Sequence, residues 1–297
     1  MTPSSESASG RHAGRLRIVL GITILILVVE LAGALLSNSL ALLADAGHVF
    51  TDVAGLSLTL IAIRFAARPA TPKRTYGHYR LEILAAVVNA VLLFGVAGLV
   101  LVEAWRRLAH PPEVAGPLML GTALVGLCAN AVSLWMLRRG QRESLNLRGA
   151  YLEVLGDLLG SLAVVVAAGV IAWTGLRAAD PLASIAVGLM ILPRTVRLLR
   201  EAVDVLLEAT PRGIDLDEVR RHILGAPGVA DVHDLHVWSI TSGLNAVSAH
   251  VVAEDGADPA EVLDHLARCL DGDFDVAHST FQVEPRDRRA LEDVAHE

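Results

Sequence analysis

Four side chains that could bind a divalent metal ion lie within segments that are otherwise strongly apolar. His48 and Asp52 occur in LADAGHVFTD, and Glu153 and Asp157 occur in YLEVLGDLLG. Each pair has a spacing of four residues, which places both groups on one face of a helix. The two pairs together supply one imidazole nitrogen and three carboxylates, enough for a four-coordinate site. Ionisable groups at membrane depth are costly and mark ion paths, so we expect an intramembrane metal site.

Zinc suits this set of donors, because it accepts imidazole nitrogen and carboxylate oxygen in tetrahedral geometry. Three carboxylates would leave a zinc-occupied site with a net negative charge, so we expect metal binding to be coupled to protons. Asp45, three residues before His48, extends the same stripe and is a candidate for the ion pathway. The alternative is that the pairs are interhelical hydrogen bonds between protonated carboxyl groups.

Six apolar segments supply the helices that would carry these residues. The chain has 297 residues, of which 53% are hydrophobic, and a mean hydropathy of +0.51. Apolar runs of about 20 residues match the thickness of a bilayer core, and only helices satisfy their own backbone there. We therefore predict an all-α, six-helix transmembrane domain over residues 17–207, after a cytoplasmic tail over 1–16. The segments are 17–37, 40–66, 81–105, 116–137, 150–173 and 180–198.

Basic residues in the loops predict the orientation of these helices. Arginine and lysine are concentrated before segment one, between segments two and three, between four and five, and at the end of six, whereas the opposite loops carry only three arginines. The positive-inside rule then places both termini in the cytoplasm. One lysine among many arginines and alanines suggests a GC-rich bacterial genome, and hence the bacterial plasma (inner) membrane. The residues counted are Arg11, Arg15, Arg17, Arg64, Arg68, Lys73, Arg74, Arg80, Arg138, Arg139, Arg142, Arg148, Arg194, Arg197 and Arg200, against Arg106, Arg107 and Arg177.

After residue 208 the pattern changes to short amphipathic elements. Helices are predicted at 215–224 and 259–270, and strands at 229–240, 245–254 and 278–284. The order αββαβ suggests a cytoplasmic α+β domain of ferredoxin-like type over 208–284, followed by a charged, disordered end over 285–297. Residues 209–297 carry 7 basic and 18 acidic residues. This balance argues against nucleic-acid binding and would attract cations, although it could equally serve solubility alone.

Several classes of function lack their motifs. The two cysteines, Cys128 and Cys269, form no CxxC pair, so we expect neither a disulfide framework nor a thiolate metal site. The first apolar run is too long for a signal peptide and is predicted to be a retained helix. There is no HExxH motif and no P-loop, so we predict neither a metalloprotease nor an ATP-driven pump, and no organic cofactor.

Five motifs in order resemble the cation diffusion facilitator family of zinc and related metal transporters. They are SNSLALLADAGHVFTD, KRTYGHYRLE, RGAYLEVLGDLLGS, ADPLASI and VHDLHVWSITSG, and the resemblance covers roughly residues 17–284. It implies a homodimer of six-helix subunits with cytoplasmic ferredoxin-like domains, which exchanges metal for protons by alternating access. It also assigns the transport site to His48, Asp52, Glu153 and Asp157. Many zinc-transporting members have histidine where Glu153 stands.

The resemblance further selects His233, His250 and Glu284 as a regulatory metal site in the tail, with His278 and His236 as secondary candidates. In a regular strand, residues 233 and 236 point to opposite faces, so we expect that they do not share one mononuclear site. Histidines that bind no metal are the alternative.

The resemblance also concerns two other sites of the family. Some relatives bind a further metal in the loop after the second helix, but this chain has only His78 at the corresponding positions, so we predict no complete metal site in that loop. Arg80 resembles a basic position that pairs with an acidic residue, here Glu208, as a hinge between the domains. The alternative is an ordinary exposed pair of little energetic value.

The leading hypothesis is a secondary transporter that exports Zn²⁺ from the cytoplasm in exchange for H⁺. The alternatives are a membrane-anchored metal sensor and an exporter that prefers Co²⁺, Cd²⁺, Fe²⁺ or Mn²⁺, since an oxygen-rich site tolerates harder ions. The expected partners are metal cations, protons, membrane lipid and a second copy of the chain.

Overall fold

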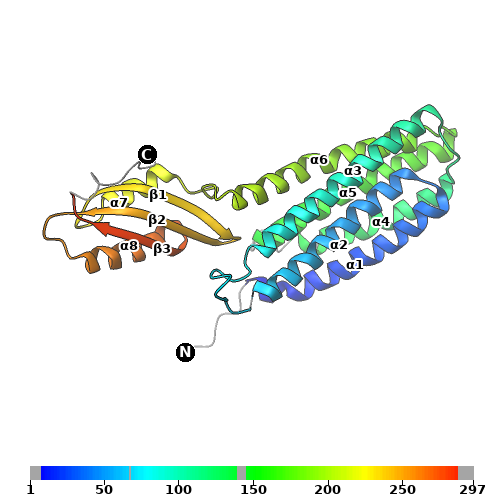
Figure 1. Cartoon of the computed structure of the whole chain (residues 1–297). Helices are drawn as coiled ribbons and strands as arrows, with labels where there is room; N and C mark the ends of the chain where they lie inside the picture. Colours follow the sequence, from blue (N-terminus) through cyan, green and yellow to red (C-terminus); the bar gives the residue numbers. More distant parts are fainter. Residues whose placement is uncertain (1–7, 67, 139–144, 287–297) are drawn as a thin grey trace. The chain divides into compact units, whose positions relative to one another are not determined.

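The computed structural model describes residues 8–66, 68–138 and 145–286, and within them six long helices precede two shorter helices and three strands (Figure 1). The structure does not describe the side chains of six loop arginines used for orientation, nor the predicted disordered end from residue 287 onward. The six are Arg11, Arg15, Arg17, Arg139, Arg142 and Arg148. The long helices are α1 (Ala8–Ser37), α2 (Leu40–Ala66), α3 (Leu81–Ala109), α4 (Gly116–Leu137), α5 (Leu145–Thr174) and α6 (Ala179–Leu206).

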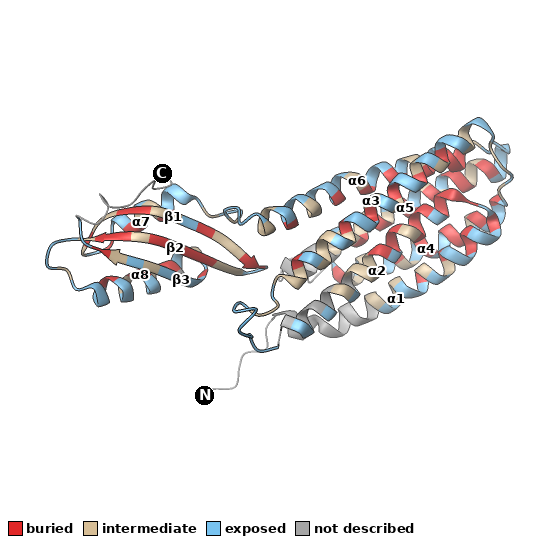
Figure 2. Ribbon diagram, viewed as in Figure 1, coloured by how far each residue is buried: buried red, intermediate tan, exposed pale blue. Residues whose placement is uncertain are grey.

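By length and composition, five of these described helices could cross a membrane, namely α1, α3, α4, α5 and α6. Helix α2 has 27 residues, only part of which the structure describes fully, and it is not among these five. Its first half contains the polar residues Asp45, His48 and Asp52. Large apolar side chains on the outer faces of the helices are exposed, such as Trp173 at 89%. The sides of the helices that face one another are buried (Figure 2). An exposed apolar surface of this extent suits lipid rather than water.

The chain divides into two compact units, one of residues 1–59 and 88–199 and the other of residues 60–87 and 200–297. In the first unit, small residues let the helices approach closely. A Cβ at Gly33 of α1 would lie only 2.3 Å from a methyl carbon of Thr122 in α4. The core of this unit is formed largely by alanine, valine and leucine side chains from all six helices. Such close contacts fix the helix positions without a hydrophobic force between helices in lipid.

Helix α2 is held at its start by a buried carboxylate from another helix. Asp180, in the first turn of α6, is fully buried. It accepts hydrogen bonds from Ser39 Oγ at 2.6 Å, from the backbone N–H of Leu40 at 2.9 Å and from that of Ala41 at 3.2 Å. The two backbone N–H groups are donors that a helix leaves unpaired at its N-terminus, and an acidic group there also complements the helix dipole. Asp180 therefore sets the position from which α2 presents its ligand residues.

The second unit contains α7 (Leu216–Leu224), β1 (Val229–Thr241), β2 (Leu244–Ala253), α8 (Pro259–Phe274) and β3 (Val276–Glu284). The predicted αββαβ order is confirmed. The sheet has the order β1-β2-β3, with β1 antiparallel and β3 parallel to β2. Asp215 and Asp258 cap the two helices by accepting backbone N–H groups two residues ahead. Val219, Ile223, Val262, Leu266 and Leu270 of the helices pack with valines of the strands into one core.

Candidate metal centres

Two helices bring three of the predicted transport ligands together. His48 Nε2 lies 3.6 Å from Asp52 Oδ2 and 3.4 Å from Asp157 Oδ1. One donor atom from each of the three residues can be chosen so that all lie within 4.8 Å of one another. The side chains are about 10% exposed or less. An imidazole and two carboxylates at these separations could close around one divalent ion with small side-chain movements.

Glycines on α5 leave room beside this cluster. Gly156 and Gly160 line a cavity of about 60 Å³ together with Asp45, His48 and Arg194, and its remaining walls are Val187, Met190 and Ile191. A Cβ at Gly160 would come within 3.1 Å of Asp45 Oδ1. The cavity is large enough to hold water. An ion bound by the cluster could therefore take a water molecule from this cavity as a further ligand.

Asp45 joins a second polar layer next to the cluster. Its Oδ2 accepts a hydrogen bond from Ser161 Oγ at 3.1 Å, and that hydroxyl in turn accepts one from Asn130 Nδ2 at 3.2 Å. Asp45 thereby links α2 to α5 and α4. Its assignment to the ion pathway stays a prediction, and its position on the cavity wall is compatible with it.

Glu153, the fourth predicted ligand, has a different partner. Its Oε1 accepts a hydrogen bond from Arg194 Nη2 at 2.5 Å, across from α5 to α6. Glu153 is absent from the group of donors that lie within 4.8 Å of one another. Our sequence argument counted Arg194 only as a loop charge. The feature that could have pointed to Arg194 is its position directly after Pro193, inside a helix that continues to Leu206 rather than in a loop.

Glu30 of α1 is another buried carboxyl group, with 1% of its surface exposed. Gly126 of α4 makes room for it, because a Cβ there would lie 2.3 Å from Glu30 Oε1. Its other oxygen has no hydrogen-bond partner among the described residues. Sequence alone offered no partner for it, because its neighbours come from a distant helix.

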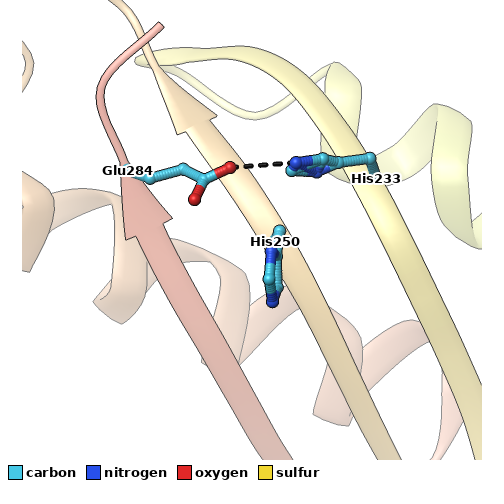
Figure 3. Close-up of side chains that lie close together, drawn as sticks. All are labelled: His233, His250 and Glu284. Carbon is cyan, nitrogen blue, oxygen red and sulfur yellow. Dashed lines mark ion pairs between the residues drawn. The ribbon is translucent and has the colours of Figure 1, made fainter. Parts of the chain in front are cut away.

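The tail holds a second cluster of donors, from three adjacent strands. His233 of β1, His250 of β2 and Glu284 of β3 have donor atoms within 4.8 Å of one another. His233 Nε2 and Glu284 Oε1 lie 2.9 Å apart, and the rings of His233 and His250 are 5.1 Å apart. Figure 3 shows His233 and Glu284 directed toward each other, with His250 on the strand between them. Two imidazoles and a carboxylate are a donor set that Zn²⁺ accepts, and the groups present therefore fit the predicted regulatory ion.

The expectation that residues 233 and 236 face opposite sides of the sheet is wrong. His233 pairs with His250, and His236 pairs with Ser248. A step of three residues along β1 therefore corresponds to a step of two residues along β2. Asp234 has a φ of 51°, and the β-bulge that it forms brings both histidines to the same face. His236 Nε2 nevertheless lies 3.0 Å from Asp234, whose other oxygen is 3.9 Å from His250 Nε2. Asp234 is thus a neighbour of the cluster that the sequence argument missed.

His278 lies away from this cluster. It pairs in register with Ala246, four residues before His250, and its ring packs edge-on against Tyr76 at 5.7 Å. Neither cysteine belongs to the donor groups found among the described residues. Burial raises the pKa of the Cys269 thiol, which disfavours the thiolate that would bind metal.

The predicted pair of Arg80 and Glu208 is present within the second unit. Arg80 Nη2 lies 2.7 Å from Glu208 Oε1, and both side chains are largely exposed. Glu208 has a φ of 59°, just after α6 ends. The chain direction changes at this residue, and its role as a hinge stays a prediction.

Comparison with known proteins covers both units. Residues 16–207 match the family model of the cation efflux transmembrane domain, and residues 211–286 match that of the cation efflux protein cytoplasmic domain. The metal cation efflux system protein CzcD of Cupriavidus metallidurans is 45% identical over 281 residues, which are 94% of this chain and 89% of that protein. The cadmium, cobalt and zinc/H(+)-K(+) antiporter of Bacillus velezensis is 40% identical over 87% of this chain and 84% of that protein. A solved metal-bound C-terminal domain of the CzcD transporter is 44% identical, covers 24% of this chain and 99% of its own, and has a TM-score of 0.23.

Proposed function

The chain belongs to the cation efflux family of membrane transporters, which are not enzymes, and from this premise we propose that it exports Zn²⁺ from the cytoplasm in exchange for protons. The observation that carries the proposal is the cluster of His48, Asp52 and Asp157 in α2 and α5, whose donor atoms lie within 4.8 Å of one another. The relative from Bacillus velezensis is described as an antiporter of cadmium, cobalt and zinc, which supports the same class of cargo.

The chemistry of the cluster explains why metal and protons would exchange. A metal ion binds the neutral imidazole of His48 and the ionised carboxylates of Asp52 and Asp157, and protons compete for the same lone pairs. When the ion leaves, two carboxylates remain close together in a poorly hydrated site. Like charges at this separation favour uptake of protons. Glu153, the fourth predicted ligand, would join the site only in a state in which it leaves Arg194.

The membrane arrangement is part of this proposal. We take α2 as the sixth span, because its length suffices and its polar residues are those of the site. Both termini then face the cytoplasm, and the described basic residues between α2 and α3 and at the end of α6 agree with the positive-inside rule. The membrane would be the bacterial inner membrane. The match to the cytoplasmic domain of the family supports a homodimer, with the tail in the cytoplasm.

The tail cluster would bind a second, regulatory Zn²⁺. His233, His250 and Glu284 would hold it between three strands, and the ion would stiffen the sheet by joining them. The pair of Arg80 and Glu208 would act as the predicted hinge during alternating access. His236 and His278 are secondary candidates for this site.

The test is zinc-driven proton flux in proteoliposomes that contain the wild type or Asp157→Ala. Zinc-dependent proton movement that disappears in the mutant, while the tail still binds zinc, supports antiport through the membrane site. A folded wild type without any metal-dependent flux, tried with Zn²⁺, Co²⁺, Cd²⁺ and Mn²⁺, contradicts transport and favours a membrane-anchored sensor that uses the tail cluster alone. Flux with one of the other ions but not with Zn²⁺ contradicts only the choice of zinc.

A further inference from the structure

A guanidinium group stands at the edge of the membrane cluster. Arg194 of α6 forms an ion pair with Glu153 of α5 at 2.5 Å, and it lines the same small cavity as His48 and Asp45. This cation comes from a helix that carries none of the predicted ligands.

The ion pair occupies the carboxylate that would otherwise complete the site. Glu153 lies one helical turn before Asp157, on the same face of α5, so spacing alone would direct both toward the ion. In the structure the group of close donors contains His48, Asp52 and Asp157, and Glu153 is bonded to Arg194 instead. Arg194 and a metal ion therefore compete for the same oxygen atoms.

Arginine is well suited to this competition. Its guanidinium keeps its charge at any physiological pH, so a change of pH does not release Glu153 by neutralising its partner. A cargo that recruits Glu153 must break this pair, whose side chains are 45% and 33% exposed, and leave the guanidinium without its partner. Losing this charge-assisted hydrogen bond opposes the recruitment of Glu153.

We propose that Arg194 is a specificity-determining residue, which withholds Glu153 from the cargo and so limits the site to one imidazole and two carboxylates. This inference rests on the proposed transport function and adds to it a reason for metal choice. Zn²⁺ is satisfied by these three donors and a water molecule. Harder ions such as Mn²⁺ favour additional carboxylate oxygen atoms and must displace Arg194 to obtain them.

Removing the guanidinium should therefore favour hard ions. In proteoliposomes, Arg194→Gln is expected to raise the ratio of Mn²⁺ to Zn²⁺ affinity, measured as 1/KM, by about tenfold, the effect of one charge-assisted bond. The double variant Arg194→Gln with Glu153→Gln lacks the released carboxylate and should return to the wild-type ratio. Arg197→Gln is the matched control, because Arg197 is exposed on the same helix and has no ion pair with a described residue.

An unchanged ratio in Arg194→Gln overturns the proposal, and so does a ratio that stays raised in the double variant. If Arg194→Gln does not fold, Arg194→Lys carries the test, because it keeps the charge but loses the two-pronged donor geometry. It should raise the ratio by about threefold, and no rise would also overturn the proposal. Equilibrium binding of Zn²⁺ and Mn²⁺ to the purified full chain, with His233→Ala and His250→Ala in all variants, gives the same ratio without transport. A protein that shows the shift in binding but no flux in the wild type would contradict antiport and still support the role of Arg194.

Discussion

The two donor clusters of this chain have similar dimensions but different supports. In each, three side chains bring donor atoms within 4.8 Å of one another. The membrane cluster joins two helices, contains one imidazole and two carboxylates, and has separations of 3.4 and 3.6 Å. The tail cluster joins three hydrogen-bonded strands, contains two imidazoles and one carboxylate, and has its closest pair at 2.9 Å.

This difference in support indicates which of the two clusters could release its metal ion more easily. Strands in register are fixed to each other by backbone hydrogen bonds, so the donors of the tail keep their separations. Helices in a membrane are held only by packing and by a few polar contacts, and they can shift relative to one another. The membrane cluster also has a competing cation, Arg194, beside it. We infer that the membrane cluster is built for exchange and the tail cluster for retention.

The largest expected effect comes from removing a membrane ligand. Asp52→Ala should lower zinc-dependent flux by at least about 100-fold, because loss of a direct ligand exceeds the 10–100-fold typical of outer partners. Zinc binding by the tail should not change. Flux is measured in proteoliposomes and tail binding by calorimetry on the same preparation. Ser57→Ala is a matched control on α2, since that exposed hydroxyl donates to the carbonyl of Val53 in its own helix. Residual flux within tenfold of the wild type would remove the distinction between the clusters.

A second change tests what positions the membrane cluster. Asp180→Ala leaves the hydroxyl of Ser39 and two backbone N–H groups of α2 without their buried acceptor, at a cost of about 3 kcal/mol. We expect a lower melting temperature in detergent and reduced flux, with unchanged zinc binding in the tail. Asp180→Asn keeps one oxygen acceptor and should lose less. Equal melting temperatures for Asp180→Ala and the wild type would show that α2 needs no such clamp.

The tail cluster should respond differently. His250→Ala is expected to abolish the rise in melting temperature that zinc gives the tail, while flux falls only a few-fold. Protons compete with the metal ion for the imidazole nitrogens, so the stabilisation by zinc should weaken as the pH falls. Melting curves of the wild type and His250→Ala, with and without zinc and at several pH values, provide the measurement. His265→Ala is the control on α8. A loss of flux as large as that of Asp52→Ala would mean that the tail ion also belongs to the transport path.

Much of this molecule could be predicted from its sequence, because helix length and strand alternation are local properties. The starts of α2, α3 and α4 agree with the apolar runs, and the tail order was correct. Two features depend on neighbours distant in the chain. The pairing of Glu153 with Arg194 requires the packing of α5 against α6, and spacing along α5 alone directed Glu153 to the metal. The face of His236 depends on the bulge at Asp234, which reverses the simple alternation of a strand.

The smallest effect is expected at Arg80 and Glu208, which both belong to the second unit. Their side chains are 40% and 58% exposed, so their coupling in stability should be at most about 1 kcal/mol. Arg80→Ala, Glu208→Ala and the double variant form a thermodynamic cycle, measured both by unfolding and by transport rate. A hinge would show coupling in the rate that exceeds the coupling in stability, because the pair would differ between conformations. Equal and small couplings in both measurements would identify an ordinary surface pair. In that event, any influence of the tail cluster on the membrane cluster would have to pass through other contacts.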